Sequence, residues 1–281
     1  MTEVTQENYY SPEMQMAYMG STQYKAFQKC EAAALAELRG EYNSPVTSAL
    51  LIGGYVDAFF SGEWYAYMER HPEMFRRDGS LKADFQRADE IIRAMERDRL
   101  YMLLMSGQKQ VIRSGFIAGV PFKIRIDSLL DADTCTQIVR EFPQAAKAMG
   151  LCDGAIVDQK VVRDFLPVWS EEAHERVSFV EAWGYDIQGA IYQEIEGNML
   201  PFIIAAGTKE DSPDLGAFYV PDDVLREKLA EIEDNAPRYQ AIKEGRIQPR
   251  RCGRCAYCRM TKRLTGILPY NDTQEDTEVL F

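Results

Sequence analysis

The chain has 281 residues, a formal net charge of −12 and 46% hydrophobic residues. This composition is typical of a globular protein with enough apolar surface for one good core. The negative charge argues against a protein whose whole surface binds nucleic acid. No apolar run reaches the roughly 18 residues that a membrane span requires, and the acidic residues 1–7 differ from a secretory signal. We therefore expect a cytoplasmic protein that does not bind a membrane.

Apolar spacing and turn residues predict one α/β domain without internal repeats. The first half is expected to contain an irregular arm over 1–20, helices over 21–39 and 47–61, a turn-rich stretch over 72–81 and a long helix over 82–105. The centre is expected to contain a strand-rich block over 109–130, broken at Ser114-Gly115 and Ala118-Gly119, an inserted short helix over 134–150 and a strand over 155–163.

The last third is expected to contain a helix over 171–197, strands over 201–206 and 216–220, and a charged helix over 221–244. We place the folded domain at 21–268, including a basic, cysteine-rich strip at 243–263. Residues 269–281 are expected to form a loose acidic tail.

The most informative motif links the ends of two predicted strands. Asp158-Gln159-Lys160 follows the apolar run 155–157, and Asp127 ends the alternating segment 122–127. Because side chains alternate along a strand, Asp158 and Lys160 share a face while Gln159 points away. Two carboxylates that hold a hard divalent cation beside an ammonium group suit phosphodiester hydrolysis. The metal activates water there, and the lysine stabilises negative charge.

A D-x-K triplet also occurs often by chance, because charged residues fill 27% of this chain. The alternative interpretation is an ordinary solvated edge strand. The setting favours the functional interpretation, since buried aliphatic residues that lead directly into carboxylates are unfavourable unless something binds the charge.

The strip at 243–263 contains eight Lys or Arg residues and one Glu, a net charge of +7. It could contact phosphate groups, or it could be a solvated helix end. The same strip contains Cys252, Cys255 and Cys258, a spacing that favours metal ligation over disulfides in a cytosolic protein. A fourth thiolate would complete a tetrahedral site; the alternative is a set of reduced, unligated cysteines. Cys135 and Cys152 are expected to be plain small side chains.

Five segments occur in a distinctive order. They are an opening helix at 21–30, a Gly53-x-x-x-Asp57 helix, a strand ending in Asp127, an I-V-D-x-K strand ending in Lys160, and a helix carrying Gln188-x-x-x-Tyr192. This order resembles the PD-(D/E)XK nuclease superfamily, and within it the RecE-like and RecB-nuclease-like exonucleases of phages and prophages. The resemblance covers residues 20–265. It implies a restriction-endonuclease-like α/β core, with a central mixed β-sheet flanked by helices and extra N- and C-terminal helices.

The resemblance also implies roles for these residues. Asp127, Asp158 and the backbone carbonyl of Gln159 would bind Mg²⁺ or Mn²⁺, and Lys160 would be the catalytic lysine. Gln188 and Tyr192 would face the active site and the DNA, because residues four apart share one helix face. The alternative for this pair is a surface position on an amphipathic helix.

Two departures from the family pattern bear on these roles. Asp57 stands where the family usually has histidine, so it would be a further metal ligand or a sign that metal binding is altered. The insertion between Asp127 and Asp158 must loop out without disturbing the strand pairing. If it does not, Asp131 or Asp133 would be the partner of Asp158.

In the related AddB-type and CRISPR-adaptation nucleases, one early and three late cysteines hold a [4Fe-4S] cluster. The resemblance therefore implies that Cys30 joins the three late cysteines, with Zn²⁺ as the alternative metal. The function it implies is a metal-dependent exonuclease acting on double-stranded DNA in phage-type recombination or repair. It also implies a homo-oligomer and a single-strand annealing recombinase as partner. The alternatives are a catalytically impaired DNA-binding or assembly subunit and a structure-selective endonuclease.

Overall fold

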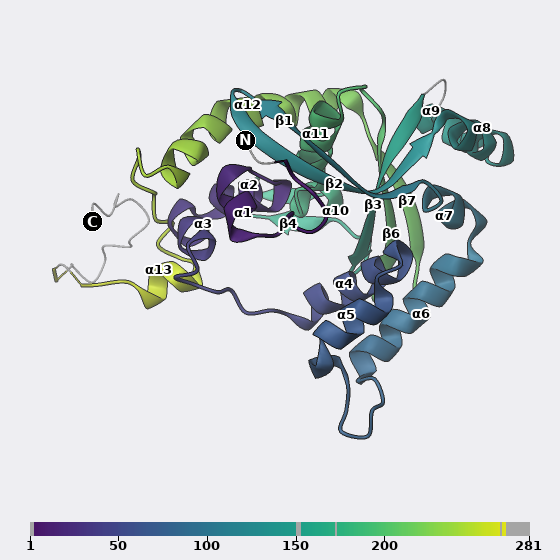
Figure 1. Ribbon diagram of the computed structural model, residues 1–281, viewed down its shortest axis with the longest axis horizontal. Helices are drawn as coiled ribbons and strands as arrows, with labels where there is room; N and C mark the ends of the chain where they lie inside the picture. Colours follow the sequence, from purple (N-terminus) through teal and green to yellow (C-terminus); the bar gives the residue numbers. More distant parts are fainter. Residues whose placement is uncertain (1–2, 150–152, 172, 265, 268–281) are drawn as a thin grey trace.

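The computed structural model describes residues 3–149, 153–171, 173–264 and 266–267 (Figure 1). A five-stranded mixed sheet forms its centre, in the order β1-β2-β3-β6-β7. These strands are β1 (Gln108–Ile117), β2 (Val120–Asp131), β3 (Gly154–Val162), β6 (Phe202–Thr208) and β7 (Leu215–Val220). β3 and β6 run parallel, and the other neighbours are antiparallel. Helices cover both faces of the sheet, so the α/β prediction is confirmed.

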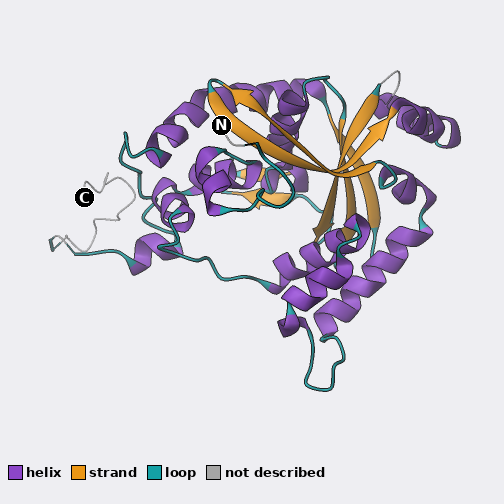
Figure 2. Ribbon diagram, in the orientation of Figure 1, coloured by secondary structure: helices purple, strands orange, loops and turns teal. Residues whose placement is uncertain are grey.

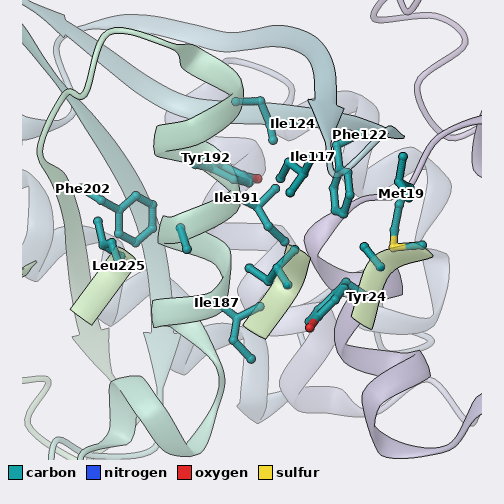
Figure 3. Packing of buried hydrophobic residues seen from close by; sticks show 14 of the residues in the cluster. Met19, Tyr24, Ile117, Phe122, Ile124, Ile187, Ile191, Tyr192, Phe202 and Leu225 are labelled. Atoms are coloured by element: carbon teal, nitrogen blue, oxygen red, sulfur yellow. The ribbon is translucent and has the colours of Figure 1, made fainter. Parts of the chain in front are cut away.

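One face of the sheet packs against four helices, which are α2 (Ser21–Lys29), α3 (Glu31–Leu38), α11 (Tyr185–Glu196) and α12 (Asp222–Lys243). Phe122 and Ile124 of β2, Ile191 of α11 and Phe202 of β6 are fully buried between these layers. Figure 3 shows Ile191 and Tyr192 lying among the strand residues Ile117, Ile124 and Phe122. This core fixes α11 against the sheet, which matters for the site below.

The other face packs against α4 (Ser48–Ser61), α6 (Ala83–Arg97), α7 (Arg99–Leu104) and α8 (Ala132–Glu141). Tyr55 of α4 and Ile91 and Met95 of α6 are completely buried there. Thr47 caps α4 by accepting a hydrogen bond from the backbone N–H of Leu50, as its sequence position favours. The prediction of a mostly buried second helix is correct only for its later turns, because Leu50 is 68% exposed.

The smaller elements are α1 (Pro12–Ala17), α5 (Trp64–Arg70), η1 (Pro72–Met74), η2 (Pro143–Ala145), α9 (Ala146–Met149), the hairpin β4 (Val168–Ser170) and β5 (Glu175–Val177), α10 (Phe179–Ala182) and α13 (Ala256–Met260). Among the described residues no helix combines the length and the apolar character that crossing a membrane demands. The predicted tail at 269–281 lies outside the described residues.

Two long predicted helices are each divided in two. The helix expected over 21–39 breaks at Cys30, whose backbone is extended (φ −166°, ψ 106°). The helix expected over 82–105 breaks at Asp98, whose side chain accepts a hydrogen bond from the N–H of Tyr101 and so starts α7. Apolar periodicity continues across both breaks, which explains why the pattern alone did not reveal them.

Three other expectations were wrong. The arm expected to be irregular over 1–20 contains the helix α1, which Ser11 caps, and Met19 forms a bridge with Phe122 of β2. Strand β1 runs through Ser114-Gly115 without a break, and the turn lies at Ala118-Gly119. The helix expected over 171–197 is instead the strand β5 followed by α10 and α11.

Candidate active site

The two acidic residues of the D…DxK motif meet where strands β2 and β3 separate. The two strands pair only from Ser128↔Val157 to Asp131↔Gly154. Beyond the pair Ser128↔Val157, β2 remains paired with β1 and β3 with β6, and Figure 2 shows the strands fanning apart. Asp127 and Asp158 are the first residues beyond that pair. The expectation that each acid ends its strand is therefore corrected, because both strands continue and only the pairing between them ends.

Strand β1 is irregular at the position facing Asp127. Gln110 has a positive φ of 53°, and no ladder pair joins it to Asp127, although their described neighbours on both sides are paired. Local irregularities of this kind bend a strand and change the direction of a side chain. The irregularity therefore lies opposite Asp127, the residue of β2 whose side chain contacts β3.

Asp158 is buried, with 1% of its surface exposed, and two groups hold its carboxylate. Gln188 of α11 donates a hydrogen bond from Nε2 to Asp158 Oδ1 at 2.6 Å, and Lys160 forms an ion pair with Oδ2. Lys160 Nζ also donates to the backbone carbonyl of Gln159 at 3.3 Å. The ammonium therefore contacts both groups that the sequence predicts as metal ligands on β3.

Gly189 allows α11 to bring Gln188 this close. A Cβ atom at Gly189 would lie 2.6 Å from Phe202 Cδ1 and 2.9 Å from Leu225 Cδ2. Because that atom would overlap two buried side chains, the close packing of α11 against β6 and α12 favours glycine here. The alternative of a surface position for Gln188 is excluded, since its exposed fraction is 7%.

Asp127 bridges the gap between the separating strands through its side chain. Its Oδ2 accepts a hydrogen bond from the backbone N–H of Gln159 at 2.9 Å. Burial raises the pKa of Asp127 well above its usual value, and the negative charges of Asp57 and Asp158 raise it further, against the opposing effect of Lys160. Such a carboxylate favours a nearby cation when it is ionised.

The other two candidate partners for Asp158 lie elsewhere. Asp131 caps α8 by accepting a hydrogen bond from the N–H of Thr134 at 2.8 Å, and Asp133 is exposed in the first turn of that helix. The insertion therefore loops out as α8, η2 and α9, while β2 and β3 pair across it.

Asp57 lies on α4 at the edge of the same cleft. Its carboxylate is 3.8 Å from the guanidinium of Arg125 and accepts a hydrogen bond from Gln110 Nε2 at 3.4 Å. Burial raises the pKa of Asp57, while Arg125 and Lys160 lower it. Its carboxylate is thus shared with a guanidinium, unlike that of Asp127.

Tyr192 of α11 contacts the strand that carries Asp127. Its hydroxyl donates a hydrogen bond to the carbonyl of Arg125 at 3.0 Å, and its ring lies 6.1 Å from that of Phe202 in an edge-on arrangement. With 7% of its surface exposed, Tyr192 holds β2 against α11 at the residue two before Asp127.

A cleft of about 480 Å³ is lined by all seven residues predicted for this site, which are Asp57, Asp127, Asp158, Gln159, Lys160, Gln188 and Tyr192. The cleft is also lined by residues that were not predicted for the site, among them Tyr9, Tyr10, Lys25, Arg125 and Tyr185. The ring centroid of Tyr185 lies 5.3 Å from Lys160 Nζ and 5.6 Å from Lys25 Nζ. Burial and the charge of Lys160 lower the pKa of Lys25 to about 8. Tyr185 lies one helical turn before Gln188, so spacing alone could have identified it.

The cleft residues fit a hard divalent cation. Asp158 Oδ2 is buried and, apart from its ion pair with Lys160, has no hydrogen-bond partner among the described atoms. Carboxylate and carbonyl oxygens are the donors that Mg²⁺ and Mn²⁺ prefer. The two acids and the Gln159 carbonyl are directed to the place where an ammonium group already lies.

The four predicted cysteine ligands form a second, separate cluster. The sulfur atoms of Cys30, Cys252, Cys255 and Cys258 all lie within 4.8 Å of one another. Among the described His, Cys, Asp and Glu side chains, no other group of three or more is this compact. The N–H of Cys255 donates to Cys252 Sγ and the N–H of Cys258 donates to Cys255 Sγ, each at 3.4 Å. Four thiols at this spacing fit Zn²⁺ or an iron–sulfur cluster.

An ion-pair network next to this cluster attaches the C-terminal strip to α3. Glu31 accepts two hydrogen bonds from the guanidinium of Arg238 at 2.7 and 2.8 Å, and a third from the backbone N–H of Arg250 at 2.6 Å. The N–H of Ala32 in turn donates to the carbonyl of Arg250 at 3.0 Å. Glu31 follows Cys30 directly, so this network and the thiol cluster both join the start of α3 to the C-terminal strip.

The basic strip is not one uniform phosphate-binding surface. Lys243, at its start, is 3% exposed and donates to the carbonyl of Tyr18 at 3.0 Å and to Gln23 Oε1 at 2.8 Å. The exposed basic residues of the strip are Arg246, Arg250, Arg254, Arg259, Lys262 and Arg263. None of these residues lines the acidic cleft.

Comparison with known proteins places this arrangement in a family. The family described as a PDDEXK-like domain of unknown function (DUF3799) matches residues 20–138 and 148–261. A crystal structure described as that of a putative exonuclease from Eubacterium rectale is 37% identical to the chain, with a TM-score of 0.83; the match covers 96% of this chain and 97% of that one. No curated protein matches the chain. The family and this neighbour support a nuclease with the predicted α/β fold. The chain belongs to the PDDEXK-like family DUF3799.

Proposed function

We propose that the protein is a metal-dependent DNA exonuclease. The observation that carries the proposal is the convergence of Asp127, Asp158 and the Gln159 carbonyl beside Lys160, at the point where two strands separate. A carboxylate pair next to an ammonium group suits the hydrolysis of a phosphodiester, which carries negative charge before, during and after the reaction.

Each residue has a distinct part in this proposal. A bound Mg²⁺ or Mn²⁺ ion supplies a more acidic water and a positive charge for the phosphate. Asp127, Asp158 and the Gln159 carbonyl hold that ion, and Lys160 stabilises charge that develops on the attacking oxygen and the phosphate. Gln188 fixes the rotamer of Asp158 through its hydrogen bond. Tyr192 positions β2 through the Arg125 carbonyl.

The biological setting rests on the resemblance and on the structural neighbour described as a putative exonuclease. We propose double-stranded DNA as substrate and phage-type recombination or repair as the process. A homo-oligomer, a single-strand annealing recombinase as partner and a cytoplasmic location belong to the same proposal. A cytoplasm keeps thiols reduced, which suits a cluster of four cysteines.

The test is the digestion of linear and closed circular DNA with Mg²⁺ or Mn²⁺. We expect the wild type to degrade the linear form and Lys160→Ala to be inactive, while Lys82→Ala, an exposed lysine next to α6, retains full activity. Rapid cutting of the closed circle would instead support the structure-selective endonuclease. A wild-type protein as inactive as Lys160→Ala at every metal concentration would contradict the enzyme.

One observation favours the second candidate, an impaired DNA-binding or assembly subunit. Asp57, at the position of the family histidine, is shared with the guanidinium of Arg125. DNA binding without hydrolysis in the same experiment would be the result that this candidate predicts.

For the thiol cluster we propose a [4Fe-4S] centre, with Zn²⁺ as the alternative. The support is the compact group of four sulfur atoms. Protein purified without oxygen should be brown, absorb light at about 400 nm and contain about four irons per chain. A colourless protein with one zinc per chain would decide for the alternative.

A further inference from the structure

The N-terminal arm, which we define as residues 4–20, runs beside β2 (Figure 1). Its residues Tyr9, Tyr10, Gln15 and Gly20 line the acidic cleft. The N–H of Met19 donates to the carbonyl of Pro121 at 2.8 Å, and the N–H of Lys123 donates to the carbonyl of Met19 at 2.9 Å. Lys123 Nζ donates to the carbonyl of Tyr9, so that part of the arm is fixed as well. The arm is therefore a built part of the cleft.

Two adjacent tyrosines of the arm differ sharply in exposure. Tyr9 is 8% exposed and lies against Lys123, whose Nζ is 4.5 Å from its ring centroid. Tyr10 is 62% exposed, although it lines the same cleft as the catalytic candidates. The two rings are perpendicular, with centroids 5.0 Å apart. Tyr9 thus fixes this part of the arm to β2, and the neighbouring ring of Tyr10 stays exposed at the cleft.

A cation also supports the Tyr10 ring. The guanidinium carbon of Arg125 is 5.0 Å from its centroid, and Arg125 is itself held by Asp57. A single exposed tyrosine is ordinary on a protein surface. This one differs because its ring is held by an aromatic edge and a guanidinium at the mouth of a cleft that contains paired carboxylates.

Nucleobases stack on such rings regardless of their identity, because every base has a π-face. A base inside a duplex already has neighbours on both faces, so only a terminal or unpaired base has a face to offer. We propose that Tyr10 is the stacking platform for a terminal or unpaired nucleobase of the strand whose phosphate enters the acidic cleft. This inference rests on the proposed nuclease function and defines the part of the substrate that the arm recognises.

The experiment measures binding of a short DNA duplex with 2-aminopurine at its terminal position, in Ca²⁺ so that binding is separated from cleavage. Stacking on a ring quenches the fluorescence of this base. We expect wild type and Tyr10→Phe to quench it, and Tyr10→Ala to bind about tenfold more weakly without quenching. Tyr65→Ala is the matched control, because Tyr65 is 75% exposed on α5 and does not line the cleft.

The salt dependence distinguishes stacking from a phosphate contact. Loss of a ring should weaken binding by the same factor at low and high salt, whereas loss of a phosphate contact changes the salt slope. Tyr10→Ala with wild-type affinity and quenching would overturn the inference and leave the nuclease proposal standing if the protein still degrades linear DNA. A wild-type protein that neither binds nor degrades DNA would overturn both.

Discussion

The acidic cleft and the four-cysteine cluster both gather groups that favour a cation, but they are built differently. The cleft takes its acids from neighbouring strands and mixes them with Lys160, Arg125 and Lys25. The cluster brings Cys30 to a strip more than 200 residues later, and its four sulfur atoms lie within 4.8 Å of one another. An open site with cations beside its ligands suits a substrate that arrives and leaves, whereas a closed set of four ligands suits a permanent structural metal.

The largest expected effect separates chemistry from folding. Asp158→Asn should lower nuclease activity by about 10³-fold or more, because an amide is a poor ligand and cannot balance the charge of Lys160. The thermal midpoint, measured in parallel, should show that the protein remains folded. Asp78→Asn, in the exposed turn before α6, is the control. Activity retained within a few-fold in Asp158→Asn would mean that the cleft is not the catalytic site.

Substitutions in the cysteine cluster should instead lower the stability of the fold. Cys258→Ser should release the metal that we propose for the cluster and cost about a few kcal/mol of stability, a fall of the order of 10 °C in Tm. Cys135→Ala, which removes a buried thiol of the other core, should leave the metal content unchanged. Elemental analysis and thermal unfolding measure both quantities. Equal metal content in Cys258→Ser and wild type would show that this thiol is not a ligand.

Gln188 should have an intermediate effect within the cleft. Gln188→Ala removes the hydrogen bond that orients Asp158, and such supporting residues typically contribute 10- to 100-fold in activity or metal affinity, so we expect a loss of about that size. The apparent Mg²⁺ requirement should rise, which a purely structural role would not produce. Gln188→Glu should be worse still, because it places a second negative charge against Asp158. An unchanged Mg²⁺ titration would contradict the positioning role.

Lys243 links the two regions, since it is the first residue of the cysteine-rich strip and donates a hydrogen bond to Gln23, which lines the cleft. Burial lowers its pKa to about 7, and burial lowers that of Lys123 to about 8. The unfolded chain, with normal lysine pKa values, binds more protons above pH 7, so stability should rise with pH from about 7 to 10. Each fully released proton contributes about 1.4 kcal/mol per pH unit.

Denaturant titrations at pH 7 and pH 9 measure this slope. Lys243→Met should reduce the gain in the free energy of unfolding between these two pH values, while Lys82→Met should not change it. An equal slope in all three proteins would mean that Lys243 remains charged in the folded state.

The smallest expected effect concerns Lys25. Lys25→Ala should weaken DNA binding by a few-fold and reduce the slope of log affinity against log salt by about one, because one phosphate contact is lost. Titrations at several salt concentrations measure the slope. An unchanged slope would assign Lys25 to the support of Tyr185 alone.

The features that could be predicted from the sequence depend on residues close together in the chain or on the order of segments along it. Alternation in β3 placed Asp158 and Lys160 on one face, and the order of five segments predicted the α/β fold that the family and the structural neighbour confirm. The catalytic and metal-binding roles of these residues stay predictions.

What the sequence could not reveal depends on tertiary contacts. The burial of Lys243 and the place of Tyr10 beside Arg125 join segments more than 100 residues apart. No local pattern encodes such contacts. The hairpin of β4 and β5 was missed because each strand has three residues, too few for a visible alternation.

The network around Glu31 has a consequence for the order in which the protein matures. Arg238 and the backbone of Arg250 hold the C-terminal strip on α3 through polar contacts that need no metal. If the four thiols bind the metal that we propose, these contacts would gather them before it arrives, and the entropic cost of collecting them would fall on folding rather than on metal uptake. Newly synthesised protein would then fold before it takes up the metal, and the supply of metal would determine when it reaches its full stability.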